Sequence, residues 1–213
     1  MKKILLLIIP IVLLAFFLLG RAQSENTLTK NESLILFKEG KSLINFSFEL
    51  AGRENFTNED LKGKWTIFFI GYTFCPDICP TTLSQLDRVY SKLTAAPYRN
   101  IQIVFVSVDP NRDKAEKLAE YVHYFNSEFI GVTSTHKQLW PFVQNLGLIY
   151  SIVDEGVDEP YYLVDHSASI VLINPNGEHH ASFQSEINES GIFNVKMDLM
   201  VENIHQIYEN WYR

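Results

Sequence analysis

The alternation of apolar, strand-like segments with segments of helical periodicity constrains the fold of this chain more than any other feature. Residues 65–73 (WTIFFIGYT) and 101–108 (IQIVFVSV) are almost continuously apolar, which is typical of strands that are covered on both faces. Residues 81–94 and 113–125 follow these segments and repeat apolar residues at helical spacing. Because a helix between two strands permits a crossover connection, this order predicts a mainly parallel sheet.

The rest of the chain extends this pattern. The further elements that we expect are strands at 44–50, 129–135, 149–154 and 167–183, a helix at 136–147 that starts or is interrupted near Pro141, and a last helix from about 193 to 211. Within the last strand region, Asn174–Gly177 (NPNG) predicts a turn between two antiparallel strands. The order is typical of a thioredoxin-like α/β fold, in which helices flank a central mixed sheet, here with an N-terminal strand or hairpin extension.

The first 21 residues differ from the rest of the chain. Lys2 and Lys3 precede an uncharged, mostly apolar run from Ile4 to Gly20. This run is longer than the apolar core of most cleaved signal peptides, about 7–15 residues, and is short for a membrane-spanning helix. We interpret residues 1–21 as a single-span membrane anchor or signal segment, residues 22–34 as a polar tether and residues 35–213 as one domain. The paired lysines predict that this domain lies beyond the membrane.

The charge of the chain after this segment argues against one class of partner. Lys2, Lys3 and Arg21 are three of the 18 basic residues, so residues 22–213 carry 15 basic against 25 acidic residues, a net charge of −10. A surface of that sign repels phosphate backbones, and we therefore expect no nucleic-acid partner.

Both cysteines of the chain, Cys75 and Cys79, lie in FCPDICP, between the strand at 65–73 and the helix at 81–94. In open α/β sheets, ligand chemistry gathers where strands end and helices begin. Pro80 suits the first turn of a helix, where its missing N–H costs nothing, and it disfavours helical geometry at the residue before it. We therefore place both cysteines in a loop. A helix N-terminus favours the thiolate, which is both a nucleophile and a soft metal ligand.

Three roles remain open for the two cysteines: a structural disulfide, a redox couple and two ligands of a metal site. A disulfide suits an exported domain, but the closed loop is so short that little chain entropy would be removed. A metal site needs a third ligand. His166 is the candidate, because the loop before the last hairpin packs against the cysteine loop in thioredoxin-like sheets, although a buried structural histidine is an equal alternative. Asp165 can orient its ring or cap the loop, and we expect His179 and His180 to be solvated beside the hairpin turn.

Four segments resemble the Sco/SenC family, the copper-binding assembly factors of cytochrome c oxidase. They are GYTFCPDICPTTL at 71–83, VSVDPNRD at 106–113, FIGVTST at 129–135 and YLVDHSASIVLINPNG at 162–177. Their order and spacing agree over roughly residues 40–210. The resemblance implies that Cys75, Cys79 and His166 are copper ligands. Where the family often has Thr-Pro, glycine and aspartate, this chain has Lys114-Ala115, Ser134 and Asn174, and none of these departures removes a ligand.

The resemblance also implies a function. We expect a metallochaperone that supplies the copper centre of cytochrome c oxidase, with the copper-bearing oxidase subunit as its target and a copper donor protein as a second partner. The domain would stand on the outer, periplasmic or equivalent, face of the inner membrane. We expect no turnover enzyme, apart from an ancillary thiol–disulfide reductase activity of a redox-active Cys75–Cys79 pair.

The residue types fit this metal, although they do not select it alone. Two thiolates and one imidazole suit three-coordinate Cu(I), and a further donor such as Asp77 or a water completes a site for Cu(II). Zinc accepts the same set with a fourth ligand.

The alternative to copper binding is a thioredoxin-like thiol–disulfide oxidoreductase. The C-x-x-x-C spacing differs from C-x-x-C but does not forbid redox activity. A thiol peroxidase would need P-x-x-x-[TS]-x-x-C, and Phe68 and Tyr72 occupy the required places before Cys75.

Overall fold

The structure, a computed structural model, describes residues 33–153, 162–189 and 191–213. The predicted anchor, residues 1–21, and the predicted tether up to residue 32 lie outside this part of the chain. None of the helices in the described ranges is long and apolar enough to cross a membrane. The elements are β1 (Leu34–Ser42), β2 (Ser47–Leu50), β3 (Phe56–Thr57), η1 (Asn58–Leu61), β4 (Trp65–Gly71), α2 (Ile78–Thr94), β5 (Ile101–Ser107), α3 (Ala115–Phe125), β6 (Ile130–Thr133), α4 (His136–Asn145), β7 (Tyr150–Val153), β8 (Leu163–His166), β9 (Ile170–Ile173), β10 (Glu178–Phe183), β11 (Glu186–Ile187), β12 (Phe193–Asn194) and α5 (Met197–Trp211).

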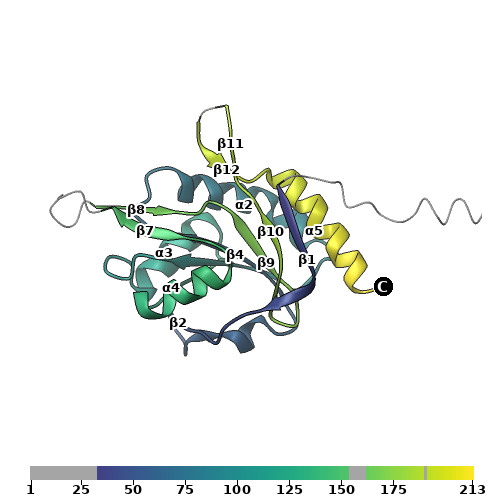
Figure 1. Cartoon of the computed structure of the whole chain (residues 1–213), viewed down its shortest axis with the longest axis horizontal. Helices are drawn as coiled ribbons and strands as arrows, with labels where there is room; N and C mark the ends of the chain where they lie inside the picture. Colours follow the sequence, from purple (N-terminus) through teal and green to yellow (C-terminus); the bar gives the residue numbers. More distant parts are fainter. Residues whose placement is uncertain (1–32, 154–161, 190) are drawn as a thin grey trace, which may run out of the picture. The chain divides into compact units, whose positions relative to one another are not determined.

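A mixed sheet of eight strands organises the domain, in the order β1-β10-β9-β4-β5-β6-β2-β3 (Figure 1). The strands β4, β5 and β6 are parallel, and β9 and β10 continue the sheet as an antiparallel hairpin next to β4. Every residue of β4 and β5 is buried, as the two almost continuously apolar segments predicted. The mixed sheet, the crossover helices and the late hairpin confirm the predicted α/β, thioredoxin-like architecture.

Helices cover both faces of the sheet, and the side chains of β4 alternate between them. Trp65 contacts Trp211 of α5, with ring centroids 5.5 Å apart, and α5 packs against α2. Phe68 points to the opposite face and contacts Phe142 of α4, also at 5.5 Å. The cysteine-bearing helix α2 therefore shares its face of the sheet with α5, and α4 covers the other face.

The N-terminal extension is larger than the sequence predicted. The strand predicted at 44–50 is β2, which is shorter and pairs with β3 and β6 at one edge of the sheet. The strand β1 was not predicted, and it pairs antiparallel with β10 at the other edge.

The prediction that His179 and His180 are solvated is wrong, since they are 2% and 8% exposed. Phe37 of β1 covers the ring of His179, and Trp211 of α5 lies against His180. Burial of both adjacent side chains is physically reasonable because successive strand residues point to opposite faces, and both faces are covered at this place.

Candidate metal centre

The two cysteines lie where β4 gives way to α2, as predicted, but Cys79 is helical. Helix α2 begins at Ile78, so Cys79 lies in its first turn and the prediction of a loop at this residue is wrong. The first N–H groups of a helix have no partner within the helix, so Pro80 is tolerated as its third residue. The first turn thus fixes Cys79, whereas Cys75 lies in the preceding loop, where its N–H donates to the carbonyl of Tyr72 at 3.2 Å.

Gly71, the last residue of β4, makes room for the buried sulfur. A Cβ atom at this position would overlap with Sγ of Cys79 and lie 2.8 Å from the ring of Phe105. The sequence analysis did not single out this glycine, although a glycine inside a strand often marks a close approach of another group. The sulfur of Cys79 therefore packs directly on the end of the central strand.

The third predicted ligand, His166, reaches the sulfurs from a separate hairpin. It ends β8, which pairs with β7 through Tyr150 opposite His166. Its Nε2 lies 3.4 Å from Sγ of Cys79. One ligand atom from each of Cys75, Cys79 and His166 can be chosen so that all three lie within 4.8 Å of one another, the one group of this kind in the described part of the chain. The structure thus brings together the three residues that the sequence proposed.

The orientation of the His166 ring suits metal binding. Its Nδ1 lies 3.1 Å from the carbonyl oxygen of Ser167. Because a carbonyl oxygen accepts only, Nδ1 donates to this carbonyl, and Nε2 faces the sulfurs. Such a bond on the far nitrogen is the usual way to fix a metal-binding imidazole. Asp165 was predicted either to orient this ring or to cap the loop, and here the backbone carbonyl of Ser167 orients the ring.

The electrostatics of the two thiols differ. Hydrogen bonding from the Cys79 side chain lowers the pKa of Cys75 to about 4, aided by His166 and by the backbone of Asp77 and Cys79, and opposed by burial. The N–H of Cys79 lies 3.4 Å from Sγ of Cys75. Burial is the largest cause that raises the pKa of Cys79, and the neighbouring Cys75 thiolate raises it further. The site therefore combines one thiolate and one thiol, with Nε2 of His166 beside them.

A surface hollow opens beside the ligands, lined among others by Cys75, Asp77, His166 and Phe193. Cys75 is 8% exposed and Cys79 is completely buried, so an incoming ion or sulfur meets Cys75 and His166 first. Asp77, named above as a further donor, shares this hollow, and its role as a ligand stays a prediction.

The chain matches known proteins over most of its length. The family model described as SCO1/SenC matches residues 38–199. A Stutzerimonas stutzeri protein named for copper binding is 32% identical over 185 residues, which is 87% of this chain and 90% of the relative. The mitochondrial protein SCO2 homolog of Mus musculus is 40% identical over 119 residues, which is 55% of this chain but 46% of the mouse protein.

Two solved structures with copper bound are similar in fold. Arabidopsis thaliana ScoI with copper is 30% identical, with a TM-score of 0.63 over 76% of this chain and 98% of that one. Yeast Sco1 with copper is 27% identical, with a TM-score of 0.65 over 78% of this chain and 89% of that one. The copper in both neighbours agrees with the predicted metal, and a cluster of two cysteines and one histidine suits it. By its sequence match and its fold, the chain belongs to the SCO1/SenC family.

Proposed function

We propose that this protein binds copper through Cys75, Cys79 and His166 and acts as a metallochaperone in the assembly of the copper centre of cytochrome c oxidase. The observation that carries the proposal is the convergence of two sulfurs and one imidazole nitrogen within 4.8 Å of one another. Thiolates and imidazole suit Cu(I), and the copper of the two structural neighbours favours this metal over zinc. Copper would here be cargo, a soft ion held until it passes to the target.

The three side chains prepare the site in different ways. Cys75 is already a thiolate because its pKa is about 4. Cys79 has a raised pKa and must lose its proton to become a ligand. His166 offers Nε2, since Nδ1 donates to the Ser167 carbonyl. Metal binding near neutral pH should therefore release the proton of Cys79.

The target and the location follow from the family and from the N-terminal sequence. We infer that the copper-bearing subunit of the oxidase receives the metal and that a copper donor protein loads it. The apolar run from Ile4 to Gly20 supports a membrane anchor that holds the domain on the outer face of the membrane. In this role the protein hands over an ion and performs no catalytic turnover.

Copper titration of the full chain, purified in detergent, tests the proposal. We expect one copper per chain and, in the Cu(II) form, a sulfur-to-copper charge-transfer band in the visible spectrum. Alanine at Cys75, Cys79 or His166 should abolish the band. A fully loaded wild-type protein without such a band would rule out thiolate ligation and with it the proposed site.

A second function, reduction of a disulfide in the target, is favoured by the low pKa of Cys75. Its thiolate would attack one sulfur of the target disulfide and release the other as a thiol. Cys79, after losing its proton, would then attack the Cys75 sulfur, form the Cys75–Cys79 disulfide and release the second target thiol. This reaction needs no imidazole ligand. Exchange with a model disulfide that is as fast in His166→Ala as in the wild type would favour it over copper delivery.

A further inference from the structure

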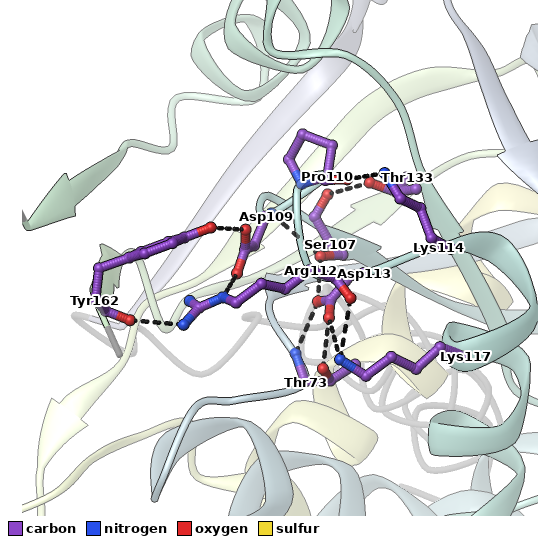
Figure 2. Close-up of polar contacts among 10 residues, drawn as sticks. All are labelled: Thr73, Ser107, Asp109, Pro110, Arg112, Asp113, Lys114, Lys117, Thr133 and Tyr162. Carbon is purple, nitrogen blue, oxygen red and sulfur yellow. Dashed lines mark hydrogen bonds and ion pairs between the residues drawn. The ribbon is translucent and has the colours of Figure 1, made fainter. Parts of the chain in front are cut away.

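A buried ionic network borders the metal centre, and none of its residues is a proposed copper ligand. It is built from the segment that follows β5, VDPNRD at 108–113, and reaches both the cysteine loop and Tyr162 (Figure 2). Two of its carboxylates, Asp109 and Asp113, are completely buried. The side chain of Arg112, which pairs with Asp109, is 9% exposed.

Arg112 and Asp109 hold the residue from which the histidine strand starts. Nε of Arg112 donates to Asp109, and Nη1 donates to the carbonyl oxygen of Tyr162 at 2.8 Å. The hydroxyl of Tyr162 donates to Asp109 at 2.6 Å, and the guanidinium carbon lies 3.6 Å from the centroid of the Tyr162 ring. Tyr162 directly precedes β8, and β8 ends at His166. The start of the histidine strand is thus fixed through side chain, ring and backbone.

The same network holds the residues that lead into the cysteine loop. The guanidinium of Arg112 also lies over the rings of Tyr72 and Phe74, 5.5 and 4.9 Å from their centroids. Between these two residues, the N–H of Thr73 donates to Asp113 at 2.8 Å, and its hydroxyl donates to the same carboxylate. Figure 2 shows both sets of bonds leaving one short loop, with Tyr162 on one side and Thr73 on the other. Arg112 is therefore in contact with both segments that carry the proposed ligands.

Stability alone explains this arrangement poorly, because well-packed apolar residues often replace a buried ion pair without loss. A planar guanidinium that bonds a carboxylate and a carbonyl and stacks on a ring fixes both distance and orientation. The proposed site needs such a constraint, since its sulfurs and its imidazole belong to separate segments. We propose that Arg112 is a positioning residue that holds the His166 strand at ligand distance from the cysteine loop, anchored by Asp109, while Asp113 fixes the loop. This inference rests on the proposed copper function.

The test compares copper affinities in the full chain. Arg112→Lys keeps the charge but loses the planar fork and the stacking. It should lower the affinity for Cu(II), which depends most on the imidazole, by roughly 10- to 100-fold, the usual effect of removing a group that orients a metal ligand. It should weaken Cu(I) less. In the His166→Ala background, Arg112→Lys should lower the Cu(I) affinity less than it does when His166 is present, because the ligand that Arg112 mainly positions is gone.

Two further variants separate positioning from general stability. Asp109→Asn combined with Arg112→Gln removes both charges together, so that no charge stays buried alone, and it replaces Arg112→Lys if that variant does not fold. Ile207→Ala truncates a buried side chain of α5, away from the network, and should lower the melting temperature without changing the ratio of Cu(II) to Cu(I) affinity. Equal losses in Arg112→Lys with and without His166 would show a purely structural role and overturn the inference.

A measurement on the metal-free protein tests the positioning role of Arg112 independently of copper binding. Amide hydrogen exchange of the metal-free Arg112 variants should be faster at residues 163–166 and 73–75, and the Ile207→Ala variant should not show this change. Unchanged exchange in both segments would overturn the positioning role. Failure of the wild type to bind copper would instead overturn the proposed function, and the exchange data would still decide whether Arg112 holds the two segments together.

Discussion

The folded protein should present Cys75 as a thiolate at pH values where an ordinary cysteine is a thiol. The pKa of Cys75 is about 4, against an ordinary value of 9.0, and hydrogen bonding from Cys79 is the largest cause. The thiolate is the form that reacts with alkylating reagents. The pH dependence of alkylation therefore measures the electrostatics of the site directly, without copper or a partner protein.

The expected effect is large. A thiol with the ordinary pKa is ~0.1% thiolate at pH 6 and ~10% at pH 8, so its alkylation rate rises nearly 100-fold between these values. Cys75, with a pKa of about 4, is almost fully thiolate at both, and its rate should stay constant within about twofold. Because Cys75 is only 8% exposed, the absolute rate also depends on access, and the ratio between the two pH values is the quantity to compare.

The assay is alkylation of the reduced, metal-free protein with iodoacetamide, with the modified cysteine identified by mass spectrometry. Cys79→Ala removes the main hydrogen-bonding partner, so the rate of Cys75 should again increase with pH in this variant. His166→Ala should have a smaller effect of the same sign, because His166 is a lesser cause of the lowered pKa. A wild-type rate that rises about tenfold per pH unit between pH 6 and 8 would refute the assignment of a thiolate.

Two further predictions concern packing and protonation in the folded state. Gly71→Ala should lower the free energy of unfolding by about 1–3 kcal/mol through overpacking against Cys79 and Phe105. In chemical denaturation, the double variant Gly71→Ala, Cys79→Ala should recover part of this loss. A Gly71→Ala variant as stable as the wild type would contradict the close packing. Burial lowers the pKa of His179 to about 4 from 6.5, so the unfolded chain binds more protons between these values and stability is lost as pH falls from 6.5 to 4. At ~1.4 kcal/mol for each unit of pKa shift, the loss of folding free energy is about 3 kcal/mol. His179→Gln should flatten the pH dependence of the denaturation midpoint between pH 6.5 and 4. An equal slope in both proteins would contradict the buried neutral imidazole.

The core of the fold could be predicted from local sequence because its elements carry strong local signals. The strands β4 and β5 are almost continuously apolar, which is typical of strands covered on both faces. The turn at Asn174–Gly177 has the composition of a hairpin turn, and the N–H of Gly177 does donate to the carbonyl of Asn174 at 2.8 Å. Together these signals place the cysteines at the end of a central strand and the last hairpin beside it.

The elements that the sequence did not predict depend on partners distant in the chain. The strand β1 contains Lys38, Glu39 and Lys41 and has no clean alternation of polar and apolar residues. It exists as a strand through its pairing with β10, more than 130 residues later. The burial of His179 follows from the same pairing, since Phe37 of β1 supplies its cover. The sequence around His179 gives no indication that β1, from the other end of the domain, pairs beside it.

The position of His166 depends on the topology of the sheet and not on the local sequence. Spacing alone could not separate a ligand from a buried structural histidine, because Cys79 and His166 are 87 positions apart. Two long-range arrangements decide the geometry: β9 pairs with β4, and the β7–β8 hairpin ends at the sulfurs. Neither fixes the angle at which β8 approaches the cysteine loop, because β8 pairs with β7 and not with β4. The rings of Phe69 and Tyr72 contact His166 directly. Arg112, lying between Tyr162 and the rings of Tyr72 and Phe74, adds a contact that holds the start of β8 to the cysteine loop.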